Sequence, residues 1–413
     1  MTSRRALLLP VAAVLVAGCA GRPVSDAPRA RASGSDGAYA GAANPMAEAG
    51  ERLLEGLPWS PDVYRVNLGA ALTQVYAMSE DILAVDSTGK VYCLSRRELS
   101  AKWVSSLRSP LSAPPAESPT HYVFVERNAA GACWLEWFSK RSGAAGDRSP
   151  VRLPFSASSG VAATAGMAFV GSLGSSQNNK TLETVNLADG TPGWSYRTLG
   201  RVVATPVVDP TGEVVLVASE DRTFTSLPTR QSGLTPTVNW VSETTAANTC
   251  APAVTKDWAF LGSDDNLLRG YDIHSGSVNW LKGLDAPIRK TPWVVGRAVT
   301  KTVTAGGEGA PATKVESFEG YVFARNATGL HCFVATTGED VFKDAGSERP
   351  LMMHGDWVVT IDAQKTAQLR KGKGLPVVRT ADFGMFDFLP TNGRDGQVIA
   401  GYADGTLLLA SPK

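Results

Sequence analysis

Apolar and polar residues alternate along most of the chain after residue 58, in short runs that end at turn residues. The stretch 265–280, "DNLLRGYDIHSGSVNW", shows the pattern: an alternating run, then Asp and Gly, then a second run that ends on Trp. Alternation with a period of two is typical of a β-strand with one buried face. Asp and Gly between two such runs favour a hairpin turn, in which Gly supplies the positive φ. The pattern therefore predicts an all-β protein built from antiparallel hairpins.

The hairpin at 265–280 is one copy of a repeat. A small residue is followed by Asp two positions later, by Gly six positions later and by an aromatic residue ten positions later, here Gly270, Asp272, Gly276 and Trp280. Self-similarity at a fixed spacing marks a repeat architecture. We therefore interpret Asp272 as a turn former and His274 as an exposed turn residue, not as ligands in a binding site.

Other copies are less regular. The repeat recurs at Thr184, Asn186, Gly190 and Trp194, and at Cys332, Val334, Gly338 and Phe342. A third copy keeps its ends at Cys93 and Trp103 but has Leu99 in place of Gly, a fourth keeps Gly374 and ends on Val378, and a stretched copy runs from Ser226 through Gly233 to Trp240. The small residue leaves room on one strand for the large ring to pack over it.

Prolines mark a second repeat that interleaves with the first. They are Pro114, Pro206, Pro252, Pro292, Pro350 and Pro390, and most precede a turn and an apolar run such as "VVLVAS" or "WAFLGS". Proline is tolerated at the start of a strand because that position can forgo a ladder hydrogen bond. Each repeat unit therefore predicts four strands: the proline strand, the apolar strand, the strand with the small residue and the aromatic strand.

The aromatic-strand positions give the number of units. They fall at or near Tyr64, Trp103, Arg152, Trp194, Trp240, Trp280, Phe342 and Val378. The first of these strands has no preceding hairpin, and the chain ends on a hairpin, "QVIAGYADGTLLLASPK", with no aromatic strand after it. We predict an eight-bladed β-propeller of four-stranded antiparallel blades at residues 58–413, with about 44 residues per blade, whose last blade is completed by the N-terminal strand.

The spacing small-x-Asp-x-x-(Thr/Ser)-Gly-x-x-x-Trp resembles the tryptophan-docking repeat of the pyrroloquinoline-quinone-like propellers. Two groups share this repeat: the quinoprotein alcohol and glucose dehydrogenases, and non-enzymatic propellers that include the lipoprotein subunit of the outer-membrane β-barrel assembly machinery. The resemblance implies the fold for nearly the whole chain after residue 58, but it does not choose between the two groups, because one fold carries many functions.

The N-terminus predicts export and lipidation. Residues 1–18 have a basic start at Arg4 and Arg5 followed by an apolar run, as in a secretory signal peptide. The end of this run, "LVAGC", resembles the lipobox of bacterial lipoproteins, which implies lipid attachment at Cys19. Ala20 favours the outer membrane, since the inner-membrane aspartate of enterobacterial lipoproteins is absent. An ordinary cleavage site is the alternative.

Residues 19–57 are a predicted flexible tether. They are rich in Ala, Gly, Ser and Pro and poor in large apolar residues, so they bury too little surface to order themselves. About 35 residues of this kind have an end-to-end reach of roughly 30–35 Å.

Composition argues against several classes of function. The net charge is +1, and loss of Arg4 and Arg5 with the signal peptide brings it to about −1, with no basic stripe for nucleic acid. Beyond Cys19 the cysteines are Cys93, Cys133, Cys250 and Cys332, none in Cys-x-x-Cys spacing. Packing is their expected role, and Cys93 with Cys133 is the pair to test for a disulfide.

The sequence singles out no catalytic or metal-ligating residue. The histidines are His121, His274, His331 and His354, and none stands in a helical pair or beside a plausible nucleophile. "GSDDN" lacks the spaced ligands of an EF-hand loop. The adjacent cysteines that accompany the quinone in the dehydrogenases are also missing. We therefore expect a protein that is not an enzyme and has no pyrroloquinoline quinone or other cofactor.

These observations favour a monomeric scaffold that is lipid-anchored on the periplasmic side of the bacterial envelope and binds an envelope protein, with outer-membrane protein assembly as the pathway that the resemblance implies. Two alternatives stay open: a propeller that binds a small ligand or polysaccharide in its central channel, and a quinoprotein-like dehydrogenase.

The repeat is interrupted once. Trp280 and Phe342 are 62 residues apart, about 20 more than one unit requires. The surplus contains "VTKTVT" and "TKVESFE", two alternating runs around a tip rich in Gly and Pro, which is typical of a hairpin. We predict that the first two strands of the sixth blade extend past the disc as a β-arm, on the face that carries the Asp-Gly turns.

Overall fold

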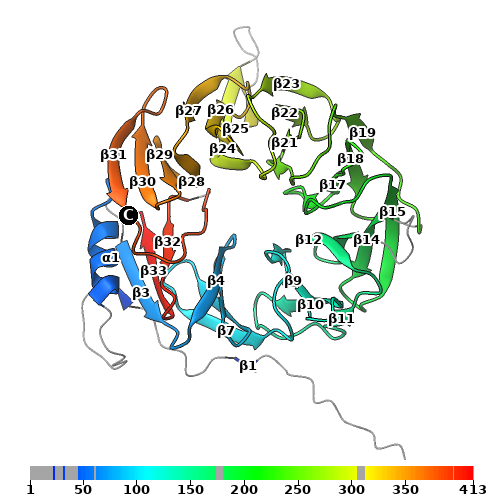
Figure 1. Cartoon of the computed structure of the whole chain (residues 1–413), viewed down its shortest axis with the longest axis horizontal. Coiled ribbons are helices and arrows are strands. Elements are labelled where there is room, and N and C mark those ends of the chain that lie inside the picture. The colour runs from blue at the N-terminus through cyan, green and yellow to red at the C-terminus, as the bar shows by residue number, and fades with distance from the viewer. Residues whose placement is uncertain are drawn as a thin grey trace, which may run out of the picture.

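The structure is a computed structural model that describes residues 22–23, 31–32, 45–59, 62–173, 180–231, 233–304, 312–393 and 395–412. Eight antiparallel sheets stand side by side in a closed ring (Figure 1). The predicted eight-bladed β-propeller is therefore confirmed. The predicted signal peptide at residues 1–18 and Cys19 lie outside the described residues.

The first four blades follow one another along the chain. Blade 1 consists of β4 (Leu72–Ala77), β5 (Asp81–Asp86), β6 (Lys90–Ser95) and β7 (Ala101–Ser106). Blade 2 consists of β8 (Ala116–Glu117), β9 (His121–Arg127), β10 (Cys133–Ser139) and β11 (Val151–Arg152). Blade 3 consists of β12 (Ala157–Ala163), β13 (Met167–Ser172), β14 (Lys180–Asn186) and β15 (Pro192–Thr198). Blade 4 consists of β16 (Val207–Val208), β17 (Val214–Ala218), β18 (Thr223–Pro228) and β19 (Trp240–Glu243).

The next three blades have the same order. Blade 5 consists of β20 (Ala253–Val254), β21 (Trp258–Gly262), β22 (Leu267–Asp272) and β23 (Val278–Gly283). Blade 6 consists of β24 (Trp293–Thr304), β25 (Ala312–Asn326), β26 (Gly329–Val334) and β27 (Asp340–Asp344). Blade 7 consists of β28 (Ser347–His354), β29 (Trp357–Asp362), β30 (Thr366–Lys371) and β31 (Val377–Asp382). All eight predicted aromatic-strand positions lie in outer strands, including the two weak ones, Arg152 and Val378.

Blade 8 joins the two ends of the chain. β32 (Val398–Gly401) and β33 (Thr406–Ser411) come from the C-terminus, and β3 (Asp62–Asn67) from the N-terminus pairs with β33 from Asp62↔Ser411 to Asn67↔Thr406. This confirms closure by the N-terminal strand. The inner strand predicted around Pro390 is not regular. It makes only isolated bridges, Phe388↔Gly401 within blade 8 and Met352↔Asn392 to blade 7.

The predicted tether at 19–57 differs from the structure in its C-terminal part. Residues Pro45–Glu55 form α1, which packs on β3 and β33 (Figure 1). Two short strands also pair with outer strands of the ring, β1 (Arg22–Pro23) with β7 and β2 (Arg31–Ala32) with β3. Composition favoured a coil, but Ala47 and Leu54 recur at helical spacing and are buried against blade 8, which stabilises the helix.

Buried apolar residues form eight clusters, one in each layer between neighbouring blades. A middle strand contributes to two layers because successive side chains point to opposite faces of its sheet. All residues of β5 are buried for this reason. The ring is thus held together by eight separate cores around a central channel.

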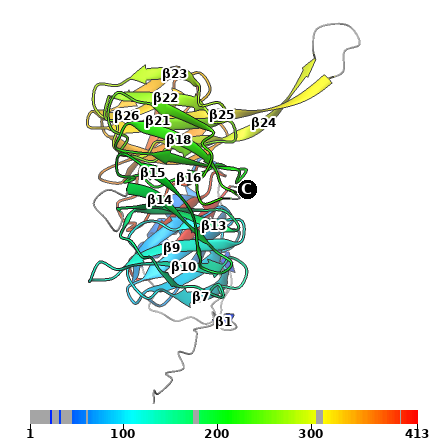
Figure 2. The same ribbon diagram turned by 90° about the vertical axis from the view of Figure 1, so that its right-hand side faces the viewer.

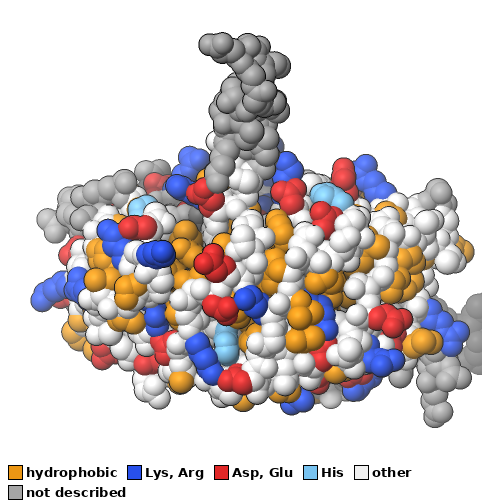
Figure 3. All heavy atoms as spheres, turned by 90° about the horizontal axis from the view of Figure 1, so that it is seen from above, with side chains coloured by type: hydrophobic (Ala, Val, Ile, Leu, Met, Phe, Trp, Pro, Cys, Tyr) orange, Lys and Arg blue, Asp and Glu red, His pale blue; other side chains and the backbone are white. Residues whose placement is uncertain are grey.

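The connections define two faces of the disc. Strand direction alternates within a blade, so the first and third connections lie at one end and the second at the other. We call the face that carries the turn 272–276 and its equivalents the upper face, and the other the lower face. Figure 3 views the rim with the upper face at the top.

Candidate functional site

The turn 272–276 is structural, as its sequence predicts. The Asp272 carboxylate accepts hydrogen bonds from the backbone N–H groups of His274 (3.0 Å) and Ser275 (2.8 Å). These bonds help hold the pKa of Asp272 below its usual value against the opposing effect of burial. Gly276 has a φ of 72°, and the His274 side chain is exposed. The Asp272 carboxylate is therefore occupied by its own turn.

Asp265, the other acid of this stretch, is occupied as well. Arg269 pairs with it at 2.5 Å, and Thr245 donates its N–H at 3.1 Å. Although burial opposes the shift, the bonds from Arg269, Ser263 and Thr245 hold the pKa of Asp265 far below its ordinary value. Asp265 thus fastens blade 5 to the end of blade 4, and it is not available to a ligand.

The tryptophans of the repeat connect blades along the upper face. The ring of Trp280 lies over Gly270 of its own blade, and its Nε1–H donates to the carbonyl of Ala335 in blade 6 at 3.0 Å. Trp240 reaches Ile273 and Trp103 reaches Lys140 in the same way, both at 2.9 Å. A methyl group added at Gly276 or Gly338 would fall about 2.5–2.7 Å from the ring of the preceding blade. The repeat therefore joins neighbouring blades through the packing of the tryptophan ring and the hydrogen bond of its Nε1–H.

In blade 2 the large ring and the small residue that it packs over occupy each other's usual positions. Trp137 stands on β10, where the other blades have a small residue, and its ring is fully buried. A methyl group at Gly146, on the following segment, would lie 1.9 Å from the indole nitrogen of Trp137. The large ring therefore comes from β10, and the outer strand β11 (Val151–Arg152) contains no aromatic residue.

The four cysteines beyond Cys19 are free and buried. Cys93 belongs to the core between blades 1 and 2, whereas Cys133 belongs to the core between blades 2 and 3. The two thiols lie on opposite sides of blade 2, so the candidate Cys93–Cys133 disulfide is wrong. Burial raises the pKa of Cys250 to about 12 and also raises the pKa of Cys93 and of Cys332, which keeps these three thiols protonated.

The remaining histidines do not come together. His331 stacks on Phe333, 3.7 Å from Asp285, while the His354 ring lies 6.2 Å from Trp59. His121, on another blade, contacts the hydroxyl of the adjacent Thr120. Within the described residues, no group of three or more His, Cys, Asp and Glu side chains is arranged to hold a metal ion. In the same part of the chain, no helix is long and apolar enough to cross a membrane.

One cavity of the ring contains an arginine that sequence reasoning missed, together with the acids Glu117 and Asp387. This cavity of about 610 Å³ is also lined by Tyr76 and Pro115 from blades 1 and 2 and by Arg349 and Phe388 from blades 7 and 8. The Arg349 guanidinium donates to the Thr391 hydroxyl at 2.8 Å and to the carbonyl of Leu389, both uncharged acceptors. Burial lowers its pKa. No sequence signal could have separated Arg349 from a surface arginine.

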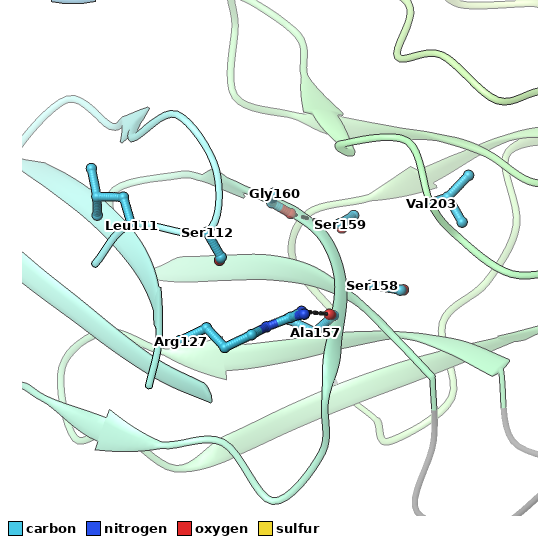
Figure 4. Close-up of a pocket in the computed structure, with 8 residues that line it drawn as sticks. All are labelled: Leu111, Ser112, Arg127, Ala157, Ser158, Ser159, Gly160 and Val203. Carbon is cyan, nitrogen blue, oxygen red and sulfur yellow. Dashed lines mark hydrogen bonds between the residues drawn. The ribbon is translucent and has the colours of Figure 1, made fainter. Parts of the chain in front are cut away.

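A second cleft, of about 480 Å³, opens beside the first strand of blade 3 (Figure 4). Its polar wall is largely backbone and serine, and its one charged side chain, Arg127, donates to the carbonyl of Ala157 at 2.6 Å. The arginine therefore joins blade 2 to blade 3.

Blade 2 also holds a pair of buried acids. Glu126 and Glu136 are nearly inaccessible on neighbouring strands. The Glu126 carboxylate accepts the N–H of Ser109 at 2.5 Å, while one oxygen of each carboxyl has no other hydrogen-bond partner. Burial, followed by the hydrogen bond and charge of Glu126, raises the pKa of Glu136 to about 9. In "HYVFVER" and "CWLEWFS" the alternation of residues places both acids on the same face as Tyr122 and Phe138. The sequence pattern could therefore have predicted that both acids are buried.

The predicted β-arm is present in blade 6. β24 and β25 pair without interruption from Trp293↔Phe323 to Thr304↔Ala312, whereas β26 pairs with β25 only from Tyr321 onward. We define the arm as residues 296–304 and 312–320. It projects far beyond the disc on the upper face (Figure 2). The hairpin prediction is thus confirmed, with its tip at 305–311 outside the described residues.

The base of the arm is closely packed. Gly296 and Gly320 stand opposite each other where the hairpin leaves the blade. A methyl group on either would meet the Phe318 ring at 2.5–2.7 Å. Phe318 also packs against the core between blades 5 and 6. The arm is therefore a continuation of blade 6, anchored in its core.

Comparison with known proteins identifies the repeat. The family described as outer membrane protein assembly factor BamB matches residues 131–374. The crystal structure of BamB from Moraxella catarrhalis is similar, with a TM-score of 0.59 and 18% identity over 84% of this chain and 96% of that one. The computationally designed Ika8 protein gives a TM-score of 0.55 and 13% identity over 84% and 97% of the two chains.

A search of curated protein sequences gives no match. The structural similarities, at identities this low, concern the fold. The family match spans more than half of the sequence and agrees with the eight blades and their docked tryptophans. The chain belongs to the family of the outer membrane protein assembly factor BamB.

Proposed function

We propose that this protein is a non-enzymatic scaffold, lipid-anchored at Cys19 on the periplasmic side of the outer membrane, that holds an envelope protein during outer-membrane protein assembly. The match of residues 131–374 to the BamB family carries the proposal. The rigid ring supports it, because eight closed cores and blade-to-blade fastenings suit a protein that presents surfaces. The arm supplies one such surface.

The N-terminal residues form the second part of this proposal. Residues 1–18 would direct export, and Cys19 would become the lipidated first residue. Because β1 (Arg22–Pro23) pairs with β7, only Ala20 and Gly21 would separate the lipidated Cys19 from the rim of the ring. The lipid would then hold the rim at blade 1 next to the membrane.

The test of anchoring is Cys19→Ser. The variant is expected in the soluble periplasmic fraction, while the wild-type protein partitions into the detergent phase. Mild crosslinking in membranes before purification should then recover one defined envelope partner with the wild type. Partition of the wild type into water would refute anchoring at Cys19.

The non-enzymatic assignment is tested separately. The Arg349 and Arg127 side chains that face the two cavities are engaged by neutral oxygens of the fold. We expect no dye-linked oxidation of alcohols or sugars after incubation with pyrroloquinoline quinone and Ca²⁺. Oxidation above the heat-inactivated control would overturn this part of the proposal.

Arg349 also favours a second function, a ligand site in the channel. A half-buried guanidinium beside a cavity of about 610 Å³, bonded only to neutral oxygens, suits a carboxylate or an acidic oligosaccharide. Succinate or oligogalacturonate should then raise the Tm of the wild type but not that of Arg349→Met. Equal shifts in both proteins would remove this alternative.

A further inference from the structure

The N-terminal segment meets the ring at its rim. β1 pairs with β7, the outer strand of blade 1, and therefore lies outside the disc and on neither of its faces (Figure 1). Only Ala20 and Gly21 separate β1 from Cys19. Three fully extended peptide units span at most about 11 Å. A lipid on Cys19 would therefore enter the membrane beside the rim of blade 1.

The rim around this point is basic. We define the basic rim as residues 101–108, which are β7 and the two residues after it, and residues 141–152, which form the outer part of blade 2. These two segments contain five exposed cationic side chains and one exposed acidic side chain, that of Asp147. The five cations are Lys102, Arg108, Arg141, Arg148 and Arg152. Because blades 1 and 2 are neighbours that share a core, these charges occupy one sector of the rim (Figure 1).

Most of this charge is not neutralised within the protein. In the part of the chain that the structure describes, Lys102 is the one member of the basic rim with an ion pair, to Asp81 at 2.5 Å. On β27, the outer strand of blade 6, Lys343 pairs with Asp285 at 2.5 Å, and two acids stand on the same strand. The surplus of positive charge is therefore a property of the basic rim and not of outer strands in general.

A half-buried tryptophan accompanies these cations. The Arg108 guanidinium lies 6.0 Å from the centroid of the Trp134 ring, and Arg152 is the cross-strand neighbour of Trp134. Tryptophan rings are typical of the membrane–water interface, where they lie at the level of the headgroups, and cationic side chains are attracted to anionic lipids. The surface beside β1 therefore combines the two kinds of side chain that suit an anionic membrane surface.

We propose that the basic rim binds the anionic phospholipid surface of the membrane, so that the disc stands on its edge with blades 1 and 2 against the headgroups. The cations contact lipid phosphates, and the Trp134 ring lies among the headgroups. Both faces of the disc then stay open to partners, and the arm lies at the end of the molecule away from the membrane (Figure 2). The inference rests on the proposed lipid anchor and adds the orientation in which it holds the ring.

An acidic protein is a poorer occupant of the basic rim. β1 lies on the same sector of the ring and keeps Cys19 within about 11 Å of β7. A membrane that holds the lipid therefore also covers the cations, and a protein bound there would have to displace it.

The first test measures binding to lipid without the anchor. The mature chain with Cys19→Ser is mixed with vesicles of phosphatidylcholine, either alone or with phosphatidylglycerol, and the bound fraction is measured by cosedimentation. Binding to the anionic vesicles should be at least about tenfold tighter, because each cation near an anionic surface adds to the affinity. High salt should remove the difference, because it screens exposed charges. Equal binding to the two kinds of vesicle, or binding to neither, would overturn the inference.

Charge reversal locates the contact. The double variant Arg141→Glu, Arg152→Glu should bind the anionic vesicles at least about tenfold more weakly than the parent chain. The matched control Arg230→Glu, Lys373→Glu makes the same change of net charge at exposed positions of blades 4 and 7, and it should keep most of the binding. An equal loss in the two variants would show that net charge, and not the basic rim, attracts the lipid.

The orientation is tested on the anchored protein. The wild-type mature chain is coupled through Cys19 to a maleimide lipid in anionic vesicles, while the four other cysteines are buried. Lysine acetylation should then decrease at Lys102 and stay unchanged at Lys343, a matched control since both side chains are partly exposed and each pairs with an acid at 2.5 Å. Shielding of Lys373 on the upper face or of Lys290 on the lower face, in place of Lys102, would show that the disc lies flat.

The outcome is separable from that of the proposed function. Vesicle binding by the Cys19→Ser chain does not depend on lipidation in the cell or on a protein partner. A protein that prefers anionic vesicles but is not anchored at Cys19 in cells would retain the basic rim as a lipid-binding surface and lose the proposed anchor. A protein that is anchored at Cys19 but has no such preference would keep the proposed function and lose the inference.

Discussion

At the scale of single residues, the blades depend on a few positions where backbone conformation and inter-blade contact coincide. Gly276 has a positive φ and also lies under the ring of Trp240 from the preceding blade. Gly212 has a similar φ of 77°, but a side chain there would meet nothing within 4 Å. Substitutions at these two glycines therefore distinguish the free-energy cost of a positive φ from the cost of a steric contact with Trp240.

Replacement of each by alanine tests this difference. Gly212→Ala should destabilise the protein by about 1 kcal/mol, the usual cost of a left-handed conformation for an L-residue. Gly276→Ala should cost a further 1–3 kcal/mol, roughly the penalty of overpacking, and should change the emission of Trp240. Chemical denaturation measures both, and equal losses would show that the ring moves away without cost.

The buried acid pair makes stability depend on pH. The pKa of Glu136 is raised to about 9 in the folded protein, from 4.5 in the unfolded chain. Between these values the folded state binds the proton and the unfolded state releases it, so the stabilising contribution is complete below pH 4.5 and is lost as pH rises toward 9. The loss is at most about 1.4 kcal/mol per pH unit.

Glu136→Gln should therefore flatten the dependence of unfolding free energy on pH between 5 and 9 and make the variant more stable than the wild type at the alkaline end. The exposed Glu243→Gln is the control and should leave the profile unchanged. Parallel profiles for Glu136→Gln and the wild type would contradict a raised pKa of Glu136 in the folded protein.

At the scale of elements, α1 and the arm are additions to the repeat with opposite relations to its core. α1 lies across the blade that joins the chain ends: Leu54 is fully buried, the Tyr402 hydroxyl donates to the carbonyl of Met46 at 2.6 Å, and Arg379 donates to that of Gly56. Among the described side chains of the arm, Phe318 at its base packs against the core.

Truncation of the helix side chains should reflect this packing. Leu54→Ala removes a fully buried side chain and should destabilise the protein by about 2–4 kcal/mol. Met46→Ala, at a side chain that is 48% exposed, keeps the backbone carbonyl and should have little effect. A small loss for Leu54→Ala would mean that blade 8 closes without the helix.

Removal of the arm tip should leave the disc intact. Deletion of residues 305–312 takes away only the tip and the last strand pair, so thermal unfolding should be nearly unchanged. Capture of the partner in crosslinked membranes should fall. A large loss of stability would show that the segment contributes to the core, and unchanged capture would show that the tip takes no part in binding the partner.

At the scale of the whole molecule, the ring is closed by residues from both ends of the chain. β3 pairs with β33 along its full length, and Arg96 of blade 1 binds Asp395 at 2.8 Å next to blade 8. We expect blade 8 to unfold first, because its strands come from the two ends of the chain and no peptide connection links β3 to β33. Hydrogen exchange should be faster in β3 than in β22 of blade 5, and faster still in Leu54→Ala.

The sequence by itself determined the repeat, the blade count, the closure of the ring and the arm. Alternation predicts strands because successive side chains face opposite sides, and Asp-Gly turns predict hairpins because few residues accept a positive φ. The period then gives the blade count, the unmatched strand at Tyr64 gives the closure, and the surplus after Pro292 gives the arm. All of these features follow from short sequence patterns and from the number of residues between their copies.

Only the tertiary structure decided the features that depend on contacts between blades. Trp137 replaces the outer-strand ring of blade 2, because a neighbouring segment supplies Gly146 to receive it. α1 is a helix, because blade 8 buries its Leu54. Cys93 and Cys133 stay apart, because opposite faces of blade 2 bury them. Each outcome depends on which surface a side chain meets in the folded ring, and a local pattern does not specify that surface.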